Sequence, residues 1–237
     1  MLKQIVISAS LLLYSINVFA CQEIASFLMP KTTVPYVELC RTEFEIGYSL
    51  ENKSPLWVGA VLTVAEAKAT EIRKNLFRAD PTLPSDQKAQ LSDYSKSGYD
   101  RGHLFSAGDA ATDQGMIESF YLSNMVPQSP INNRGIWKEL EDKVRNYAIK
   151  NHGLVVFTGP IYSAVPKTIG SNHIPVPFEL FKVIFDQYNN QSLTLIVPND
   201  KVDSLQPYIS NLDTLRSKTG IEFLPNQKAT ELDTLPF

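Results

Sequence analysis

A short segment, Tyr99–Leu104 (YDRGHL), crowds three chemically active side chains around one glycine. Asp100, Arg101 and His103 stand within four consecutive positions. A neutral imidazole can take a proton near pH 7, and a guanidinium can offset the charge of an anion. Taken singly, such residues more often have structural or solvated positions. Together these side chains could transfer a proton beside an anionic group.

A second polar cluster lies around the expected start of a helix at residues 136–149. Asn133 precedes this helix, and Glu141 and Arg145 are four residues apart on one face of it. Each has an ordinary interpretation, Asn133 as an N-cap and Glu141–Arg145 as a surface ion pair of small energy. However, Glu141 is two turns from Asn133 and can point back toward the same helix end. Amide and carboxylate oxygens of this kind suit Mg²⁺, which keeps most of its water when it binds to protein.

The two clusters, with LSNMVPQ at residues 122–128 and NNRGIWKELE at residues 132–141 between and after them, resemble the DNA/RNA non-specific endonuclease family. The active site of that family is a ββα-metal motif whose signature is DRGH. Further similar segments follow the usual family order and extend the resemblance over nearly the whole chain after residue 20. They are PLW at 55–57, VFTGPIY at 156–162, VPFELFKVI at 176–184 and TGIEFLP at 219–225.

The resemblance implies a role for each matching position. His103 corresponds to the general base that takes a proton from the attacking water. Asn133 corresponds to the asparagine that binds one divalent cation, and Glu141 to the acidic residue that orients cation-bound water. Arg101 corresponds to the arginine that contacts the scissile phosphate. The implied cation is Mg²⁺, with Mn²⁺ as a possible substitute.

Several supporting positions also follow from the resemblance. Asn124 and Arg145 match polar residues near the phosphate, and Asp100 is expected to hold the loop that presents the histidine. Arg134, together with Arg101, Arg145 and Lys138, is expected to form a basic patch that binds the nucleic-acid backbone. Contacts confined to phosphate and cation carry no base information, so the expected substrates are DNA and RNA with little sequence preference.

Alternating and β-branched segments predict an α+β fold around a largely antiparallel sheet with flanking helices and an embedded ββα-metal motif. The polar stretch Arg73–Tyr94 is interpreted as a surface excursion. Strands are expected at 43–50, 56–64, 153–158, 178–186 and 192–197, the first two as a hairpin, and helices at 136–149 and 205–218, the second ending near Gly220.

The composition limits the kinds of partner and metal site. The 237 residues include 22 Lys and Arg against 25 Asp and Glu, a net charge of −3. A nucleic-acid partner must therefore be held by local basic groups or a bound cation, because the overall field is weakly repulsive. Two cysteines and three histidines exclude a four-cysteine zinc site.

The first twenty residues read as a secretory signal peptide, with Lys3, a short apolar run and a cut after Ala20. The apolar run is too short for a membrane span. The mature chain, 21–237, is expected to be a single domain that is secreted or periplasmic. Cys21 then has two interpretations, an acylated lipoprotein cysteine or, as we prefer, a disulfide with Cys40.

The sequence therefore predicts a secreted or periplasmic Mg²⁺-dependent endonuclease. Two alternatives remain open: a nucleic-acid-binding or uptake protein that has lost catalysis, and an extracellular phosphodiesterase or phosphatase that acts on small substrates. Whether the protein is a monomer or a homodimer, and whether a protein inhibitor binds it, does not follow from the sequence.

Overall fold

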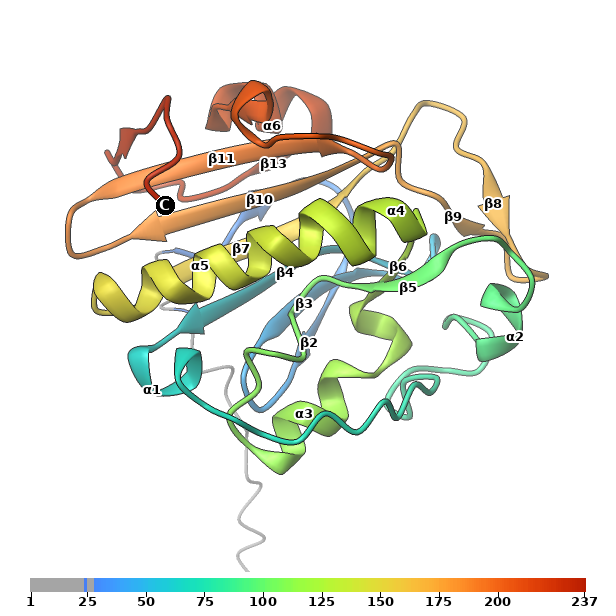
Figure 1. Ribbon diagram of the computed structural model, residues 1–237. Coiled ribbons are helices and arrows are strands. Elements are labelled where there is room, and N and C mark those ends of the chain that lie inside the picture. The colour runs from blue at the N-terminus through green and yellow to red at the C-terminus, as the bar shows by residue number, and fades with distance from the viewer. Residues whose placement is uncertain (1–23, 25–27) are drawn as a thin grey trace, which may run out of the picture.

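The computed structural model describes residue 24 and residues 28–237. Its main feature is an eight-stranded sheet in the order β12-β11-β10-β7-β4-β3-β2, with β14 paired to β11 outside that path (Figure 1). Neighbouring strands along the path are antiparallel, whereas β14 runs parallel to β11. The strands are β2 (Val37–Cys40), β3 (Glu45–Ser49), β4 (Ser54–Leu62), β7 (Leu154–Ile161), β10 (Glu179–Asp186), β11 (Gln191–Pro198), β12 (Ile209–Ser210) and β14 (Thr230–Glu231).

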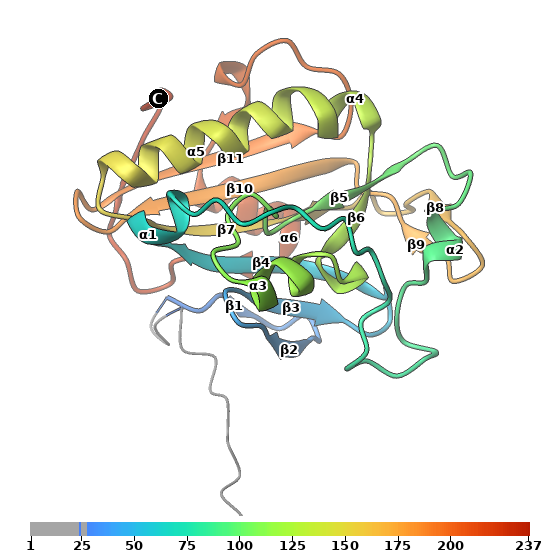
Figure 2. The same cartoon turned by 60° about the horizontal axis from the view of Figure 1, so that its bottom comes forward.

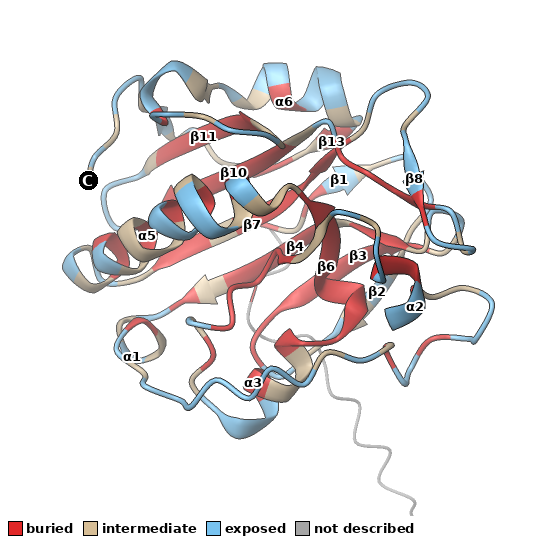
Figure 3. Cartoon of the chain, turned by 45° about the vertical axis from the view of Figure 1, so that its right-hand side comes forward, coloured by how far each residue is buried: buried red, intermediate tan, exposed pale blue. Residues whose placement is uncertain are grey.

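Both faces of the sheet are covered. Helix α5 (Lys138–Lys150) crosses one face and α6 (Leu212–Thr219) lies on the other (Figures 1 and 2). Successive side chains of a strand point to opposite faces, so Leu180 and Ile184 of β10 join the core beneath α5, and Phe181 joins the core beneath α6. Figure 3 shows the sheet mostly buried and the outer side of α5 exposed.

The DRGH segment forms strand β5 (Asp100–His103), which pairs antiparallel with β6 (Met125–Gln128). Gly102 stands opposite Val126, and a Cβ atom at this position would collide with the Gln128 side chain, so the strand pair leaves room only for glycine. The chain continues from β6 into the helical segment that ends in α5. This strand–strand–helix unit is the ββα arrangement expected from the sequence.

The helical segment after β6 is not one regular helix. It begins with α4 (Pro130–Asn132), passes through a π-helical turn at Asn133–Trp137 and continues as α5. The backbone of Gly135 departs from helical geometry, with φ −106° and ψ −111°. Such turns leave a local kink in the helix axis, and here the kink lies directly beside Asn133.

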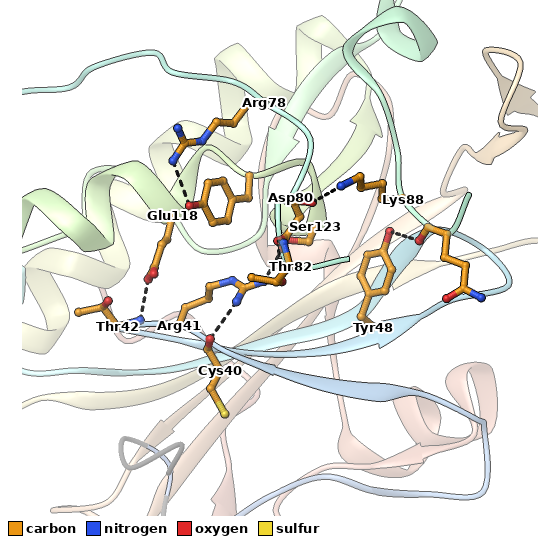
Figure 4. A network of polar contacts seen from close by, with 12 residues as sticks. Cys40, Arg41, Thr42, Tyr48, Arg78, Asp80, Thr82, Lys88, Glu118 and Ser123 are labelled. Atoms are coloured by element: carbon orange, nitrogen blue, oxygen red, sulfur yellow. Dashed lines mark hydrogen bonds and ion pairs between the residues drawn. The ribbon is translucent and has the colours of Figure 1, made fainter. Parts of the chain in front are cut away.

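The long connection between α1 (Val64–Ala67) and α2 (Leu91–Tyr94), residues 68–90, is anchored to the core through a buried residue. It leaves α1, runs along the α3 side of the molecule and ends at α2 (Figures 1 and 2). Its residue Asp80 is fully buried and accepts hydrogen bonds from Ser123 Oγ at 2.5 Å and from the Thr82 backbone and hydroxyl at 2.9 and 2.7 Å. Arg41 forms an ion pair with the same carboxylate (Figure 4). The prediction that Arg73–Tyr94 is a surface excursion is therefore wrong around Asp80, which is buried.

Smaller elements complete the fold. They are α3 (Asp113–Ser119), the 3₁₀ turns Leu122–Asn124 and Gln206–Tyr208, the strand pair β1 (Lys31–Thr32) with β13 (Ile221–Glu222), and the strand pair β8 (Thr168–Ile169) with β9 (Ile174–Pro175).

The α+β fold with a largely antiparallel sheet is confirmed, and so are the β3–β4 hairpin and the helix after Asn133. The helix expected at 205–218 is wrong in its first half. Residues 209–210 pair with β11 instead, and α6 begins only after Asn211, whose side chain accepts a hydrogen bond from the Thr214 backbone at 2.7 Å. The helix ends at Gly220, in the left-handed conformation with φ 70°.

The predicted signal peptide and Cys21 lie outside the described residues. The pairing of Cys21 with Cys40 and the alternative acylation therefore stay predictions. Within the part of the chain that the structure describes, helices are too short or too polar to cross a bilayer.

Candidate active site

A cleft of about 860 Å³ brings the two predicted clusters together. One side is formed by β5 and by residues 73–77 of the long connection, and the other by the start of α5. Six predicted site residues line it: Arg101, His103, Asn133, Arg134, Glu141 and Arg145. Asn124 is not among the lining residues.

His103, at the end of β5, is a buried and uncharged imidazole. Its side chain packs between two aromatic rings, with ring centroids 5.6 Å from Phe77 and 5.0 Å from Phe120. Burial, with smaller effects of the cations Arg73 and Arg101, lowers the pKa of His103 to about 3. The ring is therefore unprotonated at neutral pH, which is the form that a general base requires, and the same burial makes it a weaker proton acceptor than an exposed imidazole.

The same two rings hold two guanidinium groups beside the histidine. Arg101 lies over Phe77 at 4.1 Å from the ring centroid, and Arg73 lies over Phe120 at 5.1 Å. Among the described residues, neither arginine forms an ion pair with a carboxylate. Stacking on aromatic faces keeps a guanidinium in place while its charge stays available, so both can meet an anionic substrate.

Asn133 faces the cleft from the π-helical turn. Its side-chain nitrogen donates to Asp100 Oδ2 at 2.9 Å, and Arg134 donates to the two oxygens of Asp100 at 2.7 and 2.6 Å. Burial alone would raise the pKa of Asp100, but these hydrogen bonds hold it below its ordinary value. Because the amide nitrogen is used by Asp100, the Asn133 oxygen is left as an acceptor. Asn133 is not an N-cap, because it lies inside the helical segment and its side-chain amide is turned to Asp100.

Glu141 lies on the floor of the cleft, one turn into α5. Ser106 donates a hydrogen bond to its Oε2 at 3.1 Å. Burial raises the pKa of Glu141 to about 7, against the opposing effect of the buried Lys182 ammonium. The nearby Asp109 carboxylate raises it further. A carboxylate with such a pKa can exist in either protonation state under physiological conditions.

The predicted basic patch is largely neutralised within the protein. Arg145 pairs with Asp109 and Asp142, both at 2.8 Å, and not with Glu141 as a surface pair would. Lys138 pairs with Asp142 at 2.7 Å, and Arg134 with Asp100. Among the described cations that line the cleft, those without a carboxylate partner are Arg101, which the sequence indicated, and Arg73, which it did not.

Asn124 occupies a structural position rather than the expected place near the phosphate. Its fully buried side chain accepts from the Phe105 backbone at 2.8 Å and donates to the carbonyls of Phe105 and Ser119, both at 2.9 Å. Both amide hydrogens are used in this way. Asn124 therefore fixes the chain that follows His103, and the expectation that it lies near the phosphate is corrected.

The donor set fits a hydrated divalent cation. Among the described residues no group of three or more His, Cys, Asp or Glu side chains could hold a metal, so any cation must rely on few protein ligands. The free oxygen of Asn133 can supply one ligand, and the Glu141 carboxylate on the same helix is close enough in sequence to act through water. Mg²⁺ prefers such a site, because it keeps several of its own waters.

Three contributors were missed from the sequence. Arg73 and Phe77 belong to an irregular segment without periodicity, and Lys182 lies in an apolar strand where it looks like a tolerated exception. For Lys182 the sequence did offer one signal, a basic residue in an otherwise apolar strand, because a lysine is seldom buried without a partner.

Comparisons with known proteins agree with this geometry. The profile of the DNA/RNA non-specific endonuclease family matches residues 23–230. A histidine on a strand pair and an asparagine on the following helix, both facing one cleft, are what the ββα-metal motif requires. The chain belongs to the DNA/RNA non-specific endonuclease family, whose members are metal-dependent enzymes that hydrolyse nucleic acids.

Individual relatives are similar over most of the chain. Nuclease C1 of Cunninghamella echinulata var. echinulata is 31% identical over 90% of this chain and 92% of its own length. The mitochondrial nuclease EXOG of Danio rerio is 32% identical over 82% of this chain, which spans 62% of that protein. Human mitochondrial endonuclease G is 30% identical over 78% of this chain and 69% of its own.

The fold also matches a solved structure. A chain in the crystal structure of the EndoG/EndoGI complex superimposes with a TM-score of 0.76 at 26% identity, over 82% of this chain and 89% of that one. That structure concerns the mechanism of EndoG inhibition.

Proposed function

We propose that this protein is a Mg²⁺-dependent endonuclease that hydrolyses phosphodiester bonds in DNA and RNA with little base preference. The observation that carries the proposal is the pairing of an uncharged, buried His103 with a free Asn133 oxygen across one cleft. A cation held at Asn133 would polarise the phosphate and offset the charge on the departing oxygen. Mn²⁺ is the expected substitute for Mg²⁺.

The residues of the chain would divide the work as follows. His103 takes the proton from the attacking water, because its ring stays neutral at the working pH. Arg101 and Arg73 approach the phosphoryl oxygens from the aromatic side of the cleft. Glu141 offers a carboxylate to the water around the cation, and Asp100 keeps the Asn133 oxygen turned toward it.

Weak base preference is supported by the groups that line the cleft. Guanidinium groups and a hydrated cation recognise phosphate, which is the same in every nucleotide. Helix α5 enters the cleft at its floor, with its outer face covered by ion pairs such as Lys138–Asp142 and Lys143–Glu139. A helix placed in this way does not read base edges in a groove.

The decisive experiment is a plasmid-nicking assay with purified mature protein. We expect supercoiled DNA to become nicked and then degraded with Mg²⁺, and EDTA to stop the reaction. The alternative of a binding or uptake protein predicts retardation of the plasmid without nicking. The alternative of a small-substrate phosphodiesterase predicts faster hydrolysis of a nitrophenyl phosphodiester than of plasmid. Either result would overturn the proposal.

The location of the protein belongs to the same proposal. A signal peptide over residues 1–20 would deliver the mature single domain, residues 21–237, to the periplasm or the medium. An oxidising compartment would favour a disulfide between Cys21 and Cys40 over acylation of Cys21. Mass spectrometry of the mature chain distinguishes these states, because acylation adds a lipid mass and a disulfide removes two hydrogens.

A further inference from the structure

One side chain in the central sheet breaks the pattern of its strand. On β10, residues 180, 182 and 184 face the core beneath α5, where Leu180 and Ile184 are fully apolar. Lys182 stands between them and is 4% exposed. Burying an ammonium group costs several kcal/mol unless charges or dipoles compensate it, so this lysine needs a reason.

The immediate contacts of Lys182 only partly satisfy it. Its Nζ donates to Thr158 Oγ1 at 2.7 Å, from the residue opposite on β7, and lies 5.3 Å from the ring centroid of Trp137. No carboxylate among the described residues lies within 4 Å of it. Neither contact supplies negative charge, so compensation must come from further away.

Two carboxylates provide that compensation: Glu141, which lines the cleft, and Asp109, which does not. Glu141 follows Trp137 by one helical turn, and Asp109 lies in the loop after β5. A cavity of about 20 Å³ is lined by apolar residues and by Lys182, Asp109, Ser106 and Thr158, and Ser106 also donates the hydrogen bond to Glu141. Arg145 is the remaining charged group in this cluster and is already paired with Asp109.

We propose that Lys182 is a positioning residue of the active site, whose buried ammonium is the counter-charge that lets Glu141 stand ionised on the cleft floor. The proposal rests on the proposed nuclease function. It extends the catalytic machinery to the middle of the sheet, beneath residues that could touch substrate or cation. Lys182 itself does not line the cleft.

The electrostatics agree in direction. Lys182 opposes the burial that raises the pKa of Glu141, and Glu141 and Asp109 in turn oppose the burial that lowers the pKa of Lys182. The groups that face Glu141 are Lys182 from β10, Asp109 and Ser106 from the loop after β5, and Arg145 from α5. Of the two cations, Arg145 already has two carboxylate partners, whereas Lys182 forms no ion pair among the described residues and acts on both Glu141 and Asp109.

The test compares Lys182→Met, which keeps the length of the side chain and removes its charge, with the wild type. We expect kcat on plasmid to fall by about 10–100-fold, as for the loss of other supporting groups around a metal site. The acid limb of the pH profile should move up by about one unit or more. The control is Lys218→Met, which removes an exposed lysine that pairs with Glu179 at the end of the same strand, and it should keep wild-type activity.

Two measurements separate this role from a merely structural one. If Lys182 acts through Glu141, adding Lys182→Met to Glu141→Gln should cost little further activity, whereas independent effects would multiply. Additive losses with an unmoved pH profile would overturn the proposal. Should Lys182→Met fail to fold, Lys182→Gln keeps a polar partner for Thr158 and answers the same question.

A titration of the ¹³C-labelled Glu141 carboxyl by NMR needs no catalysis and no cation. Lys182→Met should raise the midpoint, and an unchanged midpoint would overturn the proposal even in an active enzyme. If the wild type did not cleave plasmid while the midpoint still moved, the nuclease function would fail and the charge coupling would stand.

Discussion

The two sides of the cleft use opposite means to prepare ionisable groups. On the β5 side, aromatic rings and two unpaired guanidiniums surround His103 and keep it uncharged. On the α5 side, a carboxylate is placed over a buried lysine within a cluster of both signs. On the β5 side, burial keeps the His103 imidazole unprotonated. On the α5 side, the Lys182 ammonium favours the ionised form of the buried Glu141 carboxyl group. A proton acceptor and an anion can thus coexist near neutral pH in one cleft.

The strongest test of this comparison removes the base. His103→Ala should reduce kcat on plasmid by roughly 10²–10⁴-fold, the usual contribution of a positioned general base. Circular dichroism and thermal unfolding should show a folded protein, since the change leaves no buried polar group unpaired. Near-normal turnover of this variant would show that the β5 side does not supply the base.

Asp100 joins the two sides, and its neutralisation should have the next largest effect. Asp100→Asn weakens the hydrogen bonds that orient Asn133 and Arg134, so the asparagine oxygen is no longer held toward the cleft. We expect a loss of about 10–100-fold in activity and a higher Mg²⁺ concentration for half-maximal rate. Asp113→Asn is the matched control, because Asp113 is an exposed partner of Lys74 outside the cleft. Equal Mg²⁺ requirements in both variants would contradict this role.

The pH profile distinguishes the two sides directly. The pKa of His103 is lowered to about 3, so its base form persists as the pH falls below neutrality. The pKa of Glu141 is raised to about 7, so its ionised form is lost as the pH falls through this value. A bound cation favours the anion, and the midpoint of kcat/KM should therefore lie at or below about pH 7. Glu141→Gln should remove this limb, and a profile identical to the wild type would assign it to another group.

The smallest effect is expected from the aromatic wall. Phe77→Leu keeps an apolar contact with His103 and removes the ring beneath Arg101. A cation–π contact contributes about 0.5–2 kcal/mol, so kcat/KM should fall by about 2–30-fold. The salt dependence of KM should stay close to that of the wild type, because the arginine charge remains. Phe178→Leu, at an exposed aromatic outside the cleft, serves as the control.

The main positions of the candidate site were predictable because they form local motifs. Asp100, Arg101 and His103 are neighbours in sequence, and Asn133 and Glu141 are linked by one helical segment. Arg73 was not predictable in this way, because it reaches the cleft through an irregular segment whose path depends on a buried carboxylate at residue 80.

Partnerships between charges were the other limit of the sequence. Arg134 and Arg145 were correctly placed at the cleft, but Asp100, the partner of Arg134, and Asp109, one of the two partners of Arg145, lie 34 and 36 residues away in the chain. Spacing rules describe neighbours on one helix and cannot find such pairs. The same holds for Asn124, whose bonds to the turn after β5 depend on the pairing of β5 with β6. Residues 209–210 likewise left the expected helix because β11 offered them a strand partner.

The anchoring of the long connection at Asp80 has a consequence for the shapes of substrate that the cleft admits. Residues 69–77 have no regular secondary structure, and Arg73 is seven residues upstream of the anchor, whereas His103 is fixed in a paired strand. Arg73 therefore reaches the cleft from an irregular segment and is held there by stacking on Phe120, whereas the base is held by a strand ladder. DNA and RNA duplexes differ in groove width and in the course of their backbones. We expect a phosphate contact made from outside the strand pair to suit both helical forms, and a comparison of cleavage rates on duplex DNA and duplex RNA tests this.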